Sequence, residues 1–288
     1  MTSIDHHIAR SQGLAPVLPP QGLRMVATSE PIEGDVWQQV CDAALDVSRR
    51  EPLLLHRLQQ LILHHSTPAA MLAAVLARRM ASEDLPEPVL QALMQDVLTC
   101  DESALRQATS DLAAVKERDP ACPDYLHVVL NLKGFHALQT HRIAHSLWRS
   151  GRAELAFALA SQASLVFAVD IHPAACIGSG VMLDHGTGIV IGETTVIEDN
   201  VSLLQNVTLG GTGKEHGDRH PKIRSGVMIG TGAKILGNIE VGTMSKVAAG
   251  SVVLKPVPPH CTVAGVPARV VRRHRDDSCP SMEMDQTI

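Results

Sequence analysis

Aromatic residues are scarce in this chain of 288 residues, which contains two Trp, one Tyr and three Phe. Aromatic side chains supply much of the buried area in an ordinary globular core, so this core must be built mainly from aliphatic side chains. Cysteines occur at positions 41, 100, 122, 176, 261 and 279, and none forms a CxxC pair or a zinc-type array. We expect them to be small buried residues or free thiols in a reducing compartment.

The chain also lacks a long basic run and a long apolar run. Its formal net charge is −5, and the only compact basic cluster is Arg269, Arg272, Arg273 and Arg275. That cluster is weak support for a nucleic-acid partner and would equally suit a phosphorylated small molecule. No uncharged run reaches the roughly 20 residues of a membrane span, and the N-terminus has no apolar signal segment. We therefore expect a cytoplasmic protein that binds neither nucleic acid nor a membrane.

What the chain has instead is an aliphatic residue at every sixth position between residues 171 and 258, with two shifts of phase. A six-residue period matches neither an isolated helix nor an alternating strand. It fits a prism of short strands in which each aliphatic anchor points inward and stacks on its copy one coil away. The pattern therefore predicts a parallel β-helix. The anchors are Ile171, Ile177, Leu183, Ile189, Ile191, Ile197, Leu203, Leu209, Ile223, Ile229, Ile235, Val241, Val247 and Val253.

The rest of the chain divides into three further parts and gives an α+β fold. Residues 1–34 are rich in Pro and Gly and are expected to form a flexible arm. Residues 35–167 show helical periodicity and predict an all-helical N-terminal domain. The β-helix domain is expected over 168–271, with its strand ladder ending near Pro258-Pro259 because proline cannot donate to a ladder. Residues 272–288 are expected to be a flexible tail.

Capping residues mark several helix ends in the N-terminal domain. Thr67-Pro68 predicts an N-cap followed by Pro at the first helical position. Asp101 predicts the cap of a helix that ends before Asp119-Pro120, since a residue preceding Pro avoids the helical region. The domain also holds several His residues, which we expect on the surface or at satisfied interior positions because no carboxylate accompanies them at ligand spacing. They are His56, His64, His65, His136, His141 and His145.

The two interruptions of the repeat are the best places to look for function. One follows the residues Leu183 to Gly188. The other is the segment 210–222, which sets the anchors Leu209 and Ile223 fourteen positions apart where twelve would keep phase. A polar, Gly-rich loop expelled from a rigid solenoid is typical of a functional site.

Specific motifs resemble the bacterial serine O-acetyltransferases over about residues 35–275. The β-helix region contributes VDIHPAACIGSGVMLDHGTGIVIGETTVIEDNV, LLQNVTLGGTGK, DRHPKI, GAKILGN and AGVPARVV, and the helical region contributes RDPA (118–121) and KGFHALQTHRIAH (133–145). The resemblance implies a left-handed β-helix and an acyltransferase that moves the acetyl group of acetyl-CoA to the hydroxyl of L-serine. The products would be O-acetyl-L-serine and CoA, in the first step of cysteine biosynthesis. Feedback inhibition by L-cysteine is implied too, with no permanently bound cofactor and no metal.

The resemblance also assigns catalytic residues. Serine must lose its hydroxyl proton as it attacks the thioester, and a His with a pKa near 7 is a natural general base. His185 matches the family's base, and Asp170 matches the carboxylate that orients it. Their separation of fifteen residues is close to one coil of the prism, which places them on nearby levels. His220 matches a second active-site His, with Glu193 as its expected partner.

Substrate-binding positions follow in the same way. In the family two carboxylates hold the serine ammonium group and an Arg holds its carboxylate, and the matching residues are Asp119, Asp184 and Arg219, beside His220. The family's sites lie between neighbouring subunits of a trimer or of a dimer of trimers, so His185 and His220 would come from different chains. For acetyl-CoA the matching positions are Gly211, Thr212, Thr231, Lys246 and Ala249, where Thr231 departs from the expected Ala.

Other functions stay open at this point. A β-helix carbonic anhydrase binds its metal through three His from adjacent chains, for which His172, His185, His216 and His220 are candidates. An acyltransferase acting on a sugar or another amine is a further alternative, although the helical motifs argue against it. The family's C-terminal Ile inserts into O-acetylserine sulfhydrylase, so Ile288 suggests that partner. Against this, the tail is short and Thr287 stands where Gly is more usual.

Overall fold

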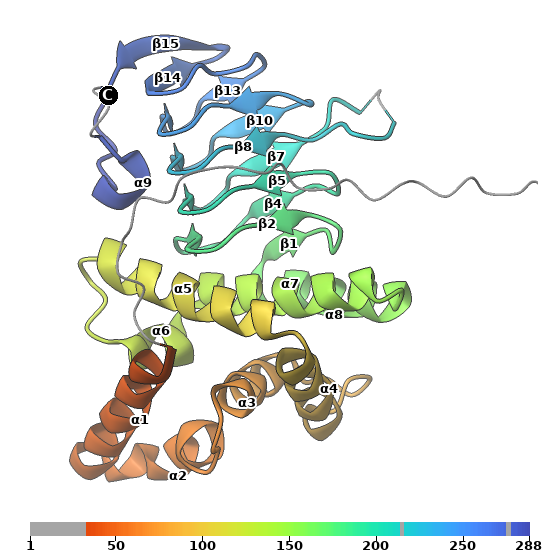
Figure 1. Cartoon of the computed structure of the whole chain (residues 1–288), viewed down its shortest axis with the longest axis vertical. Coiled ribbons are helices and arrows are strands. Elements are labelled where there is room, and N and C mark those ends of the chain that lie inside the picture. Colours follow the sequence, from red (N-terminus) through yellow and green to blue (C-terminus); the bar gives the residue numbers. More distant parts are fainter. Residues whose placement is uncertain (1–32, 214–215, 275–277) are drawn as a thin grey trace, which may run out of the picture. The chain divides into compact units, whose positions relative to one another are not determined.

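The computed structural model describes residues 33–213, 216–274 and 278–288 (Figure 1). The predicted arm at 1–34 therefore lies outside the described residues, except for Glu33 and Gly34, which begin α1.

The predicted helical domain comes first in the described chain. Thr67 caps α3 by accepting from the Ala70 amide at 3.2 Å, and Asp101 caps α5 by accepting from the Ala104 amide at 3.3 Å. The chain leaves α5 after Arg118, immediately before Asp119-Pro120, as predicted. The elements are α1 (Glu33–Arg50), a 3-10 turn (Pro52–Leu54), α2 (Leu55–Leu58), a π-helical turn (Gln59–Leu63), α3 (Pro68–Met80), α4 (Glu87–Cys100), α5 (Glu102–Arg118), α6 (Tyr125–Asn131), α7 (Lys133–Arg149) and α8 (Ala153–Phe167).

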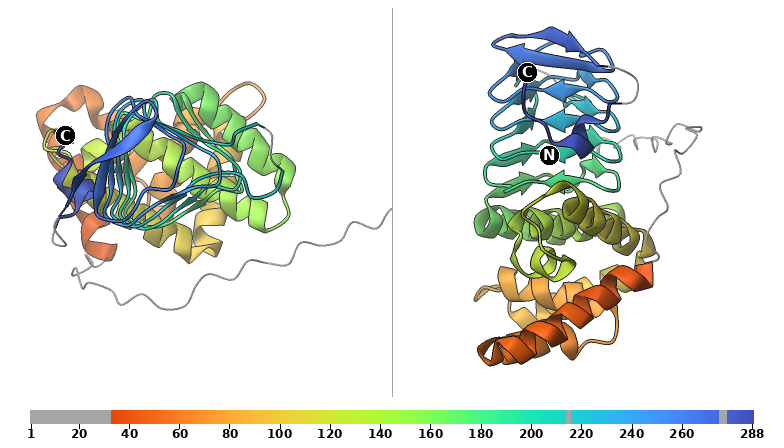
Figure 2. Two further views of the ribbon diagram at one scale, coloured as in Figure 1. Left: turned by 90° about the horizontal axis from the view of Figure 1, so that it is seen from above. Right: turned by 90° about the vertical axis from the view of Figure 1, so that its left-hand side faces the viewer.

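The strands after α8 wind into a parallel β-helix, as the hexads predicted. Successive coils form three sheets, and Figure 2 shows the coils stacked when seen from above. The anchors pair in register from coil to coil, for example Ile171 with Ile191 and Ile191 with Leu209, and they are buried. Sheet A contains β1 (Val169–Ile171), β4 (Ile189–Ile191), β7 (Thr208–Gly210), β10 (Lys234–Leu236) and β13 (Val252–Val253). Sheet B contains β2 (Cys176–Ile177), β5 (Val196–Ile197), β8 (Lys222–Ile223) and β11 (Glu240–Val241), and sheet C contains β3 (Met182–Leu183), β6 (Ser202–Leu203), β9 (Met228–Ile229), β12 (Lys246–Val247), β14 (Cys261–Gly265) and β15 (Ala268–Arg273).

The predicted end of the ladder near Pro258-Pro259 is wrong. Val257 still bridges to Val241, and β14 then pairs parallel to β12 before β15 folds back antiparallel. The two prolines lie in the corner between sheets B and C, where the ladder does not need their missing N–H groups. Gly242 in the coil below makes room for them, because a Cβ there would lie 2.5 Å from the Pro259 nitrogen.

The described part of the expected tail packs against sheet C. It contains α9 (Pro280–Glu283), and Ser281 is fully buried. The Ser202 hydroxyl donates to the Ser281 carbonyl at 3.0 Å. Lys246 Nζ donates to the Asp285 carbonyl at 2.9 Å and to the Thr287 carbonyl at 2.5 Å. The polarity of residues 278–288 had suggested exposure, but their backbone carbonyls are the groups that make these contacts.

A buried ion pair joins the helices to the first coil. The coil's lower edge has no further coil beneath it, so its backbone groups need other partners. Arg142 on α7 donates to the carbonyls of Ile177 and Gly178 at 3.2 and 2.7 Å, and Asp111 on α5 accepts from the Val181 amide at 2.9 Å. The two side chains pair with each other at 2.7 Å and are almost completely buried.

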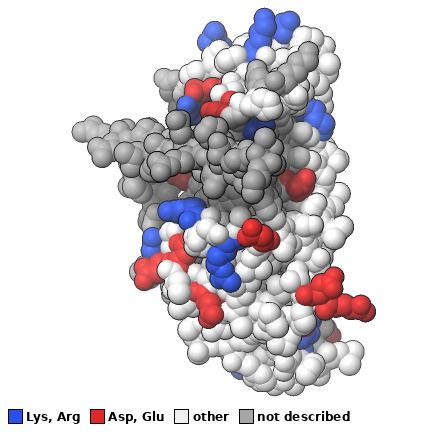
Figure 3. Space-filling model, turned by 90° about the vertical axis from the view of Figure 1, so that its right-hand side faces the viewer, with Lys and Arg blue, Asp and Glu red and all other residues white. Residues whose placement is uncertain are grey.

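Among the described residues, no helix is long and apolar enough to cross a bilayer. Acidic and basic side chains are interspersed on the described part of the face drawn in Figure 3.

Candidate active site

Most of the predicted site residues lie along the two corners of the prism that flank sheet A, at opposite ends of its strands. These two corners are called the two edges of sheet A below. The chain passes from sheet C to sheet A through one corner of the prism, and from sheet A to sheet B through the next. His185 lies at the first corner, after β3. Glu193 and Arg219 lie at the second, after β4 and in the loop after β7. Within one chain, each corner therefore holds part of the predicted site.

The first group, here the His185 cluster, contains Asp119, Asp184 and His185. His185 has a positive φ of 56°, and its side chain is 74% exposed. A non-Gly residue in this region is uncommon, and such strained residues are typical of active sites. The His185 Nε2 lies 3.8 Å from Asp184 Oδ1. Burial raises the pKa of Asp184, the charge of Asp119 raises it further, and His185 lowers it. The structure therefore brings the two predicted ammonium-binding carboxylates close to the predicted base.

The helical domain supports this corner through a close backbone contact. A Cβ on Gly134, in the first turn of α7, would lie 1.9 Å from the Leu183 carbonyl oxygen. Gly186 also lies close to Gly134, since a Cβ added to Gly186 would lie 3.1 Å from the Gly134 Cα. The Lys133 ammonium donates to the Thr187 hydroxyl in the same turn. Only a residue without a side chain fits at position 134, which gives a physical reason for the Gly in the KGFHALQ motif.

Arg118 anchors the residue next to it, Asp119, and was missed by the sequence analysis. Its guanidinium donates to Ser202 Oγ at 3.1 Å and to Asn200 Oδ1 at 3.3 Å, and it contacts Met282 Sδ at 3.2 Å. The side chain is buried, with 4% exposure, and burial lowers its pKa. These contacts fix the end of α5 on the β-helix. The RDPA motif had drawn attention to its Asp, but nothing in the sequence showed where the Arg would point.

The second group, here the His220 cluster, contains Glu193, Thr194, Arg219 and His220. Arg219 Nη2 donates to Glu193 Oε2 at 2.6 Å, and this hydrogen bond lowers the pKa of Glu193. The predicted partner of Glu193 was His220, whereas its observed partner is Arg219. Arg219 and His220 both lie near the Glu193 carboxylate. The Arg219 side chain is the longer of the two, and its guanidinium reaches the carboxylate.

The tautomer of His220 follows from its own partner. The Thr194 amide donates to His220 Nδ1 at 3.2 Å, so Nδ1 accepts and the neutral ring carries its proton on Nε2. Burial lowers the pKa of His220, and the charge of Arg219 lowers it further. The ring is therefore suited to donating a hydrogen bond from Nε2 to an oxygen.

Gly192 leaves the space that the His220 ring fills. A Cβ on Gly192 would lie 2.1 Å from His220 Nε2. We predict that Gly192→Ala displaces the ring and lowers kcat about 10²-fold, since a misplacement of about 1 Å in an active site costs that much. Steady-state kinetics checks this. Equal activity of Gly192→Ala and wild type would contradict the prediction.

Asp170 is the middle residue of β1, and it pairs in register with Val190. Its neighbour Val169 contacts the turn that follows His185, because a Cβ on Gly186 would lie 3.2 Å from Val169 Cγ2. The Gly188 amide in the same turn donates to the Ala168 carbonyl at 2.7 Å. The pairing of Asp170 with His185 stays a prediction.

The predicted acetyl-CoA positions also divide between the two edges. Thr231 lies two coils above His185 and Ala249 lies three coils above it, each at the position in its coil that His185 has in its own. The Gly250 amide donates to the Thr231 carbonyl at 2.8 Å. Gly211 and Thr212 lie at the other corner, at the start of the expelled loop. Lys246 is separate from both: it is buried on sheet C beneath the carbonyls of the C-terminal segment.

The loop at 210–222 returns to the His220 cluster. Lys214 and Glu215 lie outside the described residues. Lys222 Nζ pairs with Asp218 at 2.6 Å and donates to the Thr194 carbonyl at 2.8 Å, which ties the loop's end to the second corner. Of the four His considered for a metal, His216 is exposed in this loop. In the parts of the chain that are described, no three His, Cys, Asp or Glu side chains are grouped so as to hold a metal ion.

Comparison with known proteins assigns the family. Residues 36–140 match the family model described as "Serine acetyltransferase, N-terminal". The chain is 53% identical over 251 residues to a serine acetyltransferase of Salmonella typhimurium, covering 87% of this chain and 92% of that protein.

Solved structures agree in fold. A serine acetyltransferase in complex with cysteine is 49% identical with a TM-score of 0.87, covering 89% of this chain and all of that one. A Brucella abortus serine acetyltransferase in complex with coenzyme A is 48% identical with a TM-score of 0.82, covering 84% and 96%. A soybean serine acetyltransferase complexed with serine is 52% identical with a TM-score of 0.81, covering 83% and 98%. With this identity over most of its length, the chain belongs to the serine acetyltransferase family.

Proposed function

We propose that the protein transfers the acetyl group of acetyl-CoA to the hydroxyl of L-serine, at a site shared between two subunits. The observation that carries the proposal is the separation of the site residues onto the two edges of sheet A, with the predicted base and the predicted carboxylate clamp on one edge and Arg219 and His220 on the other. The structures of relatives with serine, cysteine and coenzyme A support the choice of ligands. In a symmetric trimer, one edge of each subunit meets the other edge of its neighbour.

The His185 cluster supplies the base and the ammonium site. Asp119 and Asp184 hold the serine ammonium group, which relieves the repulsion between the two carboxylates. The neighbouring subunit's edge supplies Arg219 for the serine carboxylate. His185 takes the hydroxyl proton as the serine oxygen attacks the thioester carbon. Asp170, on the strand that contacts the turn after His185, orients the imidazole and stabilises its positive charge.

The collapse of the intermediate completes the reaction. The attack forms a carbon–oxygen bond and places a negative charge on the former carbonyl oxygen, which the Nε2–H of His220 stabilises by donating to it. The carbon–sulfur bond then breaks, and the CoA sulfur leaves with the proton held by His185. The backbone around Thr231, Ala249, Gly211 and Thr212 borders the channel along which CoA lies, and Lys246 serves its phosphates when the C-terminal carbonyls release it.

The acceptor is tested by CoA release across a panel of nucleophiles. We expect L-serine to release CoA at a far higher kcat/KM than L-homoserine or glucosamine, because the clamp fits an ammonium and a carboxylate on one carbon. L-cysteine, which differs from serine only in sulfur, should inhibit competitively against serine. If glucosamine or homoserine releases as much CoA as serine, the assignment of the substrate is wrong.

The proposed assembly is a trimer or a dimer of trimers in the cytoplasm. We also propose O-acetylserine sulfhydrylase as a partner through Ile288, whose side chain is 61% exposed. A pocket that captures a terminal carboxylate and an aliphatic side chain would suit this residue. A peptide of residues 279–288 should bind the sulfhydrylase, and replacing its Ile288 by Ala should abolish binding. Absence of binding at about 1 mM peptide, a concentration that detects contacts of only about 4 kcal/mol, would exclude the partner.

A further inference from the structure

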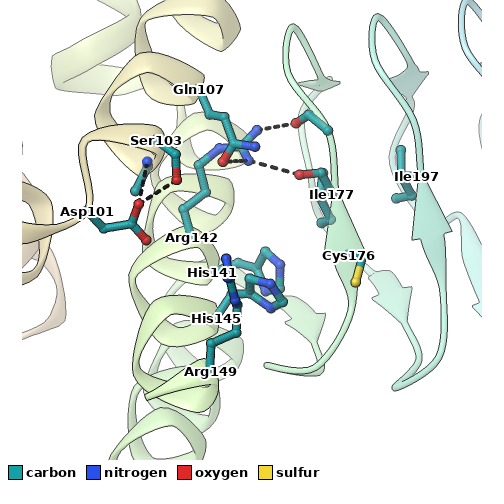
Figure 4. Close-up of a pocket in the computed structure, with 12 residues that line it drawn as sticks. Asp101, Ser103, Gln107, His141, Arg142, His145, Arg149, Cys176, Ile177 and Ile197 are labelled. Atoms are coloured by element: carbon teal, nitrogen blue, oxygen red, sulfur yellow. Dashed lines mark hydrogen bonds between the residues drawn. The ribbon is translucent and has the colours of Figure 1, made fainter. Parts of the chain in front are cut away.

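A polar cavity of about 270 Å³ lies between the helical domain and the first coils of the β-helix (Figure 4). Its walls come from α5, α7, β2 and β5. The strands β2 and β5 belong to sheet B, whereas the proposed active site lies along the edges of sheet A. None of the residues assigned to catalysis, serine or acetyl-CoA lines this cavity.

The cavity is lined by one anionic and one cationic side chain that do not form a salt bridge with each other. Asp101 and Arg149 both line it, and both charges act on His145: Asp101 raises the pKa of His145 and Arg149 lowers it. Among the described residues, Arg149 has no ion-pair or hydrogen-bond partner for its side chain. The Asp101 carboxylate is ionised, since hydrogen bonds from Ser103 and neighbouring groups lower its pKa. An unpaired cation and an anion thus face one space without forming a salt bridge.

Two imidazoles line the same cavity, and one of them, His145, offers an acceptor atom. His141 and His145 lie one helical turn apart on α7, with ring centroids 5.7 Å apart, and Figure 4 shows both rings directed toward Cys176 on β2. His145 Nδ1 lies 2.8 Å from the Pro173 carbonyl and must donate to it, which leaves Nε2 as an acceptor. His141 is 5% exposed, and its Nδ1 is buried without a partner. Burial lowers the pKa of both rings, so both are neutral near pH 7.

Arg142 also lines the cavity, but its donors are already used. It bonds Asp111, Gln107 and the edge of the first coil. It therefore forms a fixed wall, and the groups left to bind a ligand are Asp101, His145 and Arg149. Two of these accept hydrogen bonds and one donates.

We infer that this cavity is a second, non-catalytic binding site for a small amino acid. The ligand's ammonium group supplies donors for the Asp101 carboxylate and for His145 Nε2, and its carboxylate accepts from Arg149. A zwitterion thus bridges the gap between Asp101 and Arg149. A ligand with only one of the two charges would leave either the Asp101 carboxylate or the Arg149 guanidinium without a partner of opposite charge.

The thiol of Cys176 provides a direct probe of occupancy. It is exposed and lines the cavity, whereas Cys100 is equally a free, exposed thiol but lies outside it. The full-length protein carrying Arg219→Ala, which weakens the proposed serine site, is labelled with a maleimide, and the rate at each thiol is followed by peptide mass spectrometry. The probe ligand is L-alanine, because it has both charges but neither a hydroxyl nor a thiol.

L-alanine is expected to slow the labelling of Cys176 by a factor of about 1 + [L]/Kd while leaving Cys100 unchanged. Propionate and propylamine, each with one of the charges, should protect at least about tenfold less well, because each lacks one of the two charge-assisted contacts with Asp101 and Arg149. Asp101→Asn, which keeps an N-cap residue, and Arg149→Gln, at the exposed end of α7, should each abolish protection.

The opposite results overturn the inference. These are a Cys176 labelling rate that L-alanine does not change, protection that survives both substitutions, or a Cys176 that is unreactive in the native assembly because another subunit covers the cavity. Protection by propionate alone would show an anion site and would equally contradict a site for a zwitterion. None of these outcomes depends on serine acetylation, so the acceptor assay and this experiment can fail separately.

Discussion

Replacing His185 by Ala is expected to lower kcat about 10²–10⁴-fold, the usual effect of losing a general base. His185 has a positive φ, so part of any effect of Ala could come from backbone strain. His185→Asn separates the two causes, because Asn tolerates this conformation but cannot accept the serine proton near pH 7. Both variants should be equally inactive, and the Asn variant should keep the wild-type unfolding midpoint.

The matched control is His216→Ala. His216 is exposed in the expelled loop and has no role in the proposed reaction. It was a metal-ligand candidate in the carbonic anhydrase alternative, so its loss distinguishes the two mechanisms. Serine acetylation should be unchanged in this variant. Near-wild-type turnover in His185→Asn would remove His185 from the role of base.

The largest loss of stability is expected from Arg142→Met. The substitution leaves the Asp111 carboxylate buried without its cation and removes the donors that satisfy the Ile177 and Gly178 carbonyls. Breaking a buried pair in this way costs about 3–5 kcal/mol in the free energy of unfolding. Denaturant unfolding at one fixed protomer concentration measures the loss, since assembly makes stability depend on concentration.

Two further variants make the interpretation specific. Arg106→Ala removes an exposed ion pair with Glu102 and should cost no more than about 1 kcal/mol. The double variant Arg142→Met with Asp111→Asn should be more stable than Arg142→Met alone, because it no longer buries an uncompensated charge. If Arg142→Met is as stable as Arg106→Ala, the pair does not hold the helices to the first coil.

The sequence predicted the parts of the fold that depend on local or repeated physics. The hexads predicted the β-helix because each anchor must stack on its own copy, and Ile171, Ile191 and Leu209 do so. The caps at Thr67 and Asp101 were predictable because capping involves only residues three positions away. The end of the ladder was predicted wrongly because the effect of Pro258 and Pro259 depends on whether they lie in a strand or at a corner.

Contacts between distant segments were not predictable from spacing. The bond between Glu193 and Arg219 depends on the path of the expelled loop, and the burial of Arg118 beneath Met282 joins residues 164 positions apart.

The central claim, that each site is shared between two subunits, is tested most directly by mixing two inactive chains. His185→Asn and His220→Asn are co-expressed with different tags, and the mixed assemblies are isolated by purifying on both tags in turn. In each mixed cyclic trimer isolated in this way, about one third of the seams combine an intact His185 from one chain with an intact His220 from the next. The account predicts recovery of about this fraction of wild-type kcat, whereas assemblies of either chain alone stay inactive. Mixed assemblies that are as inactive as the single variants would show that each site lies within one chain and would contradict the account.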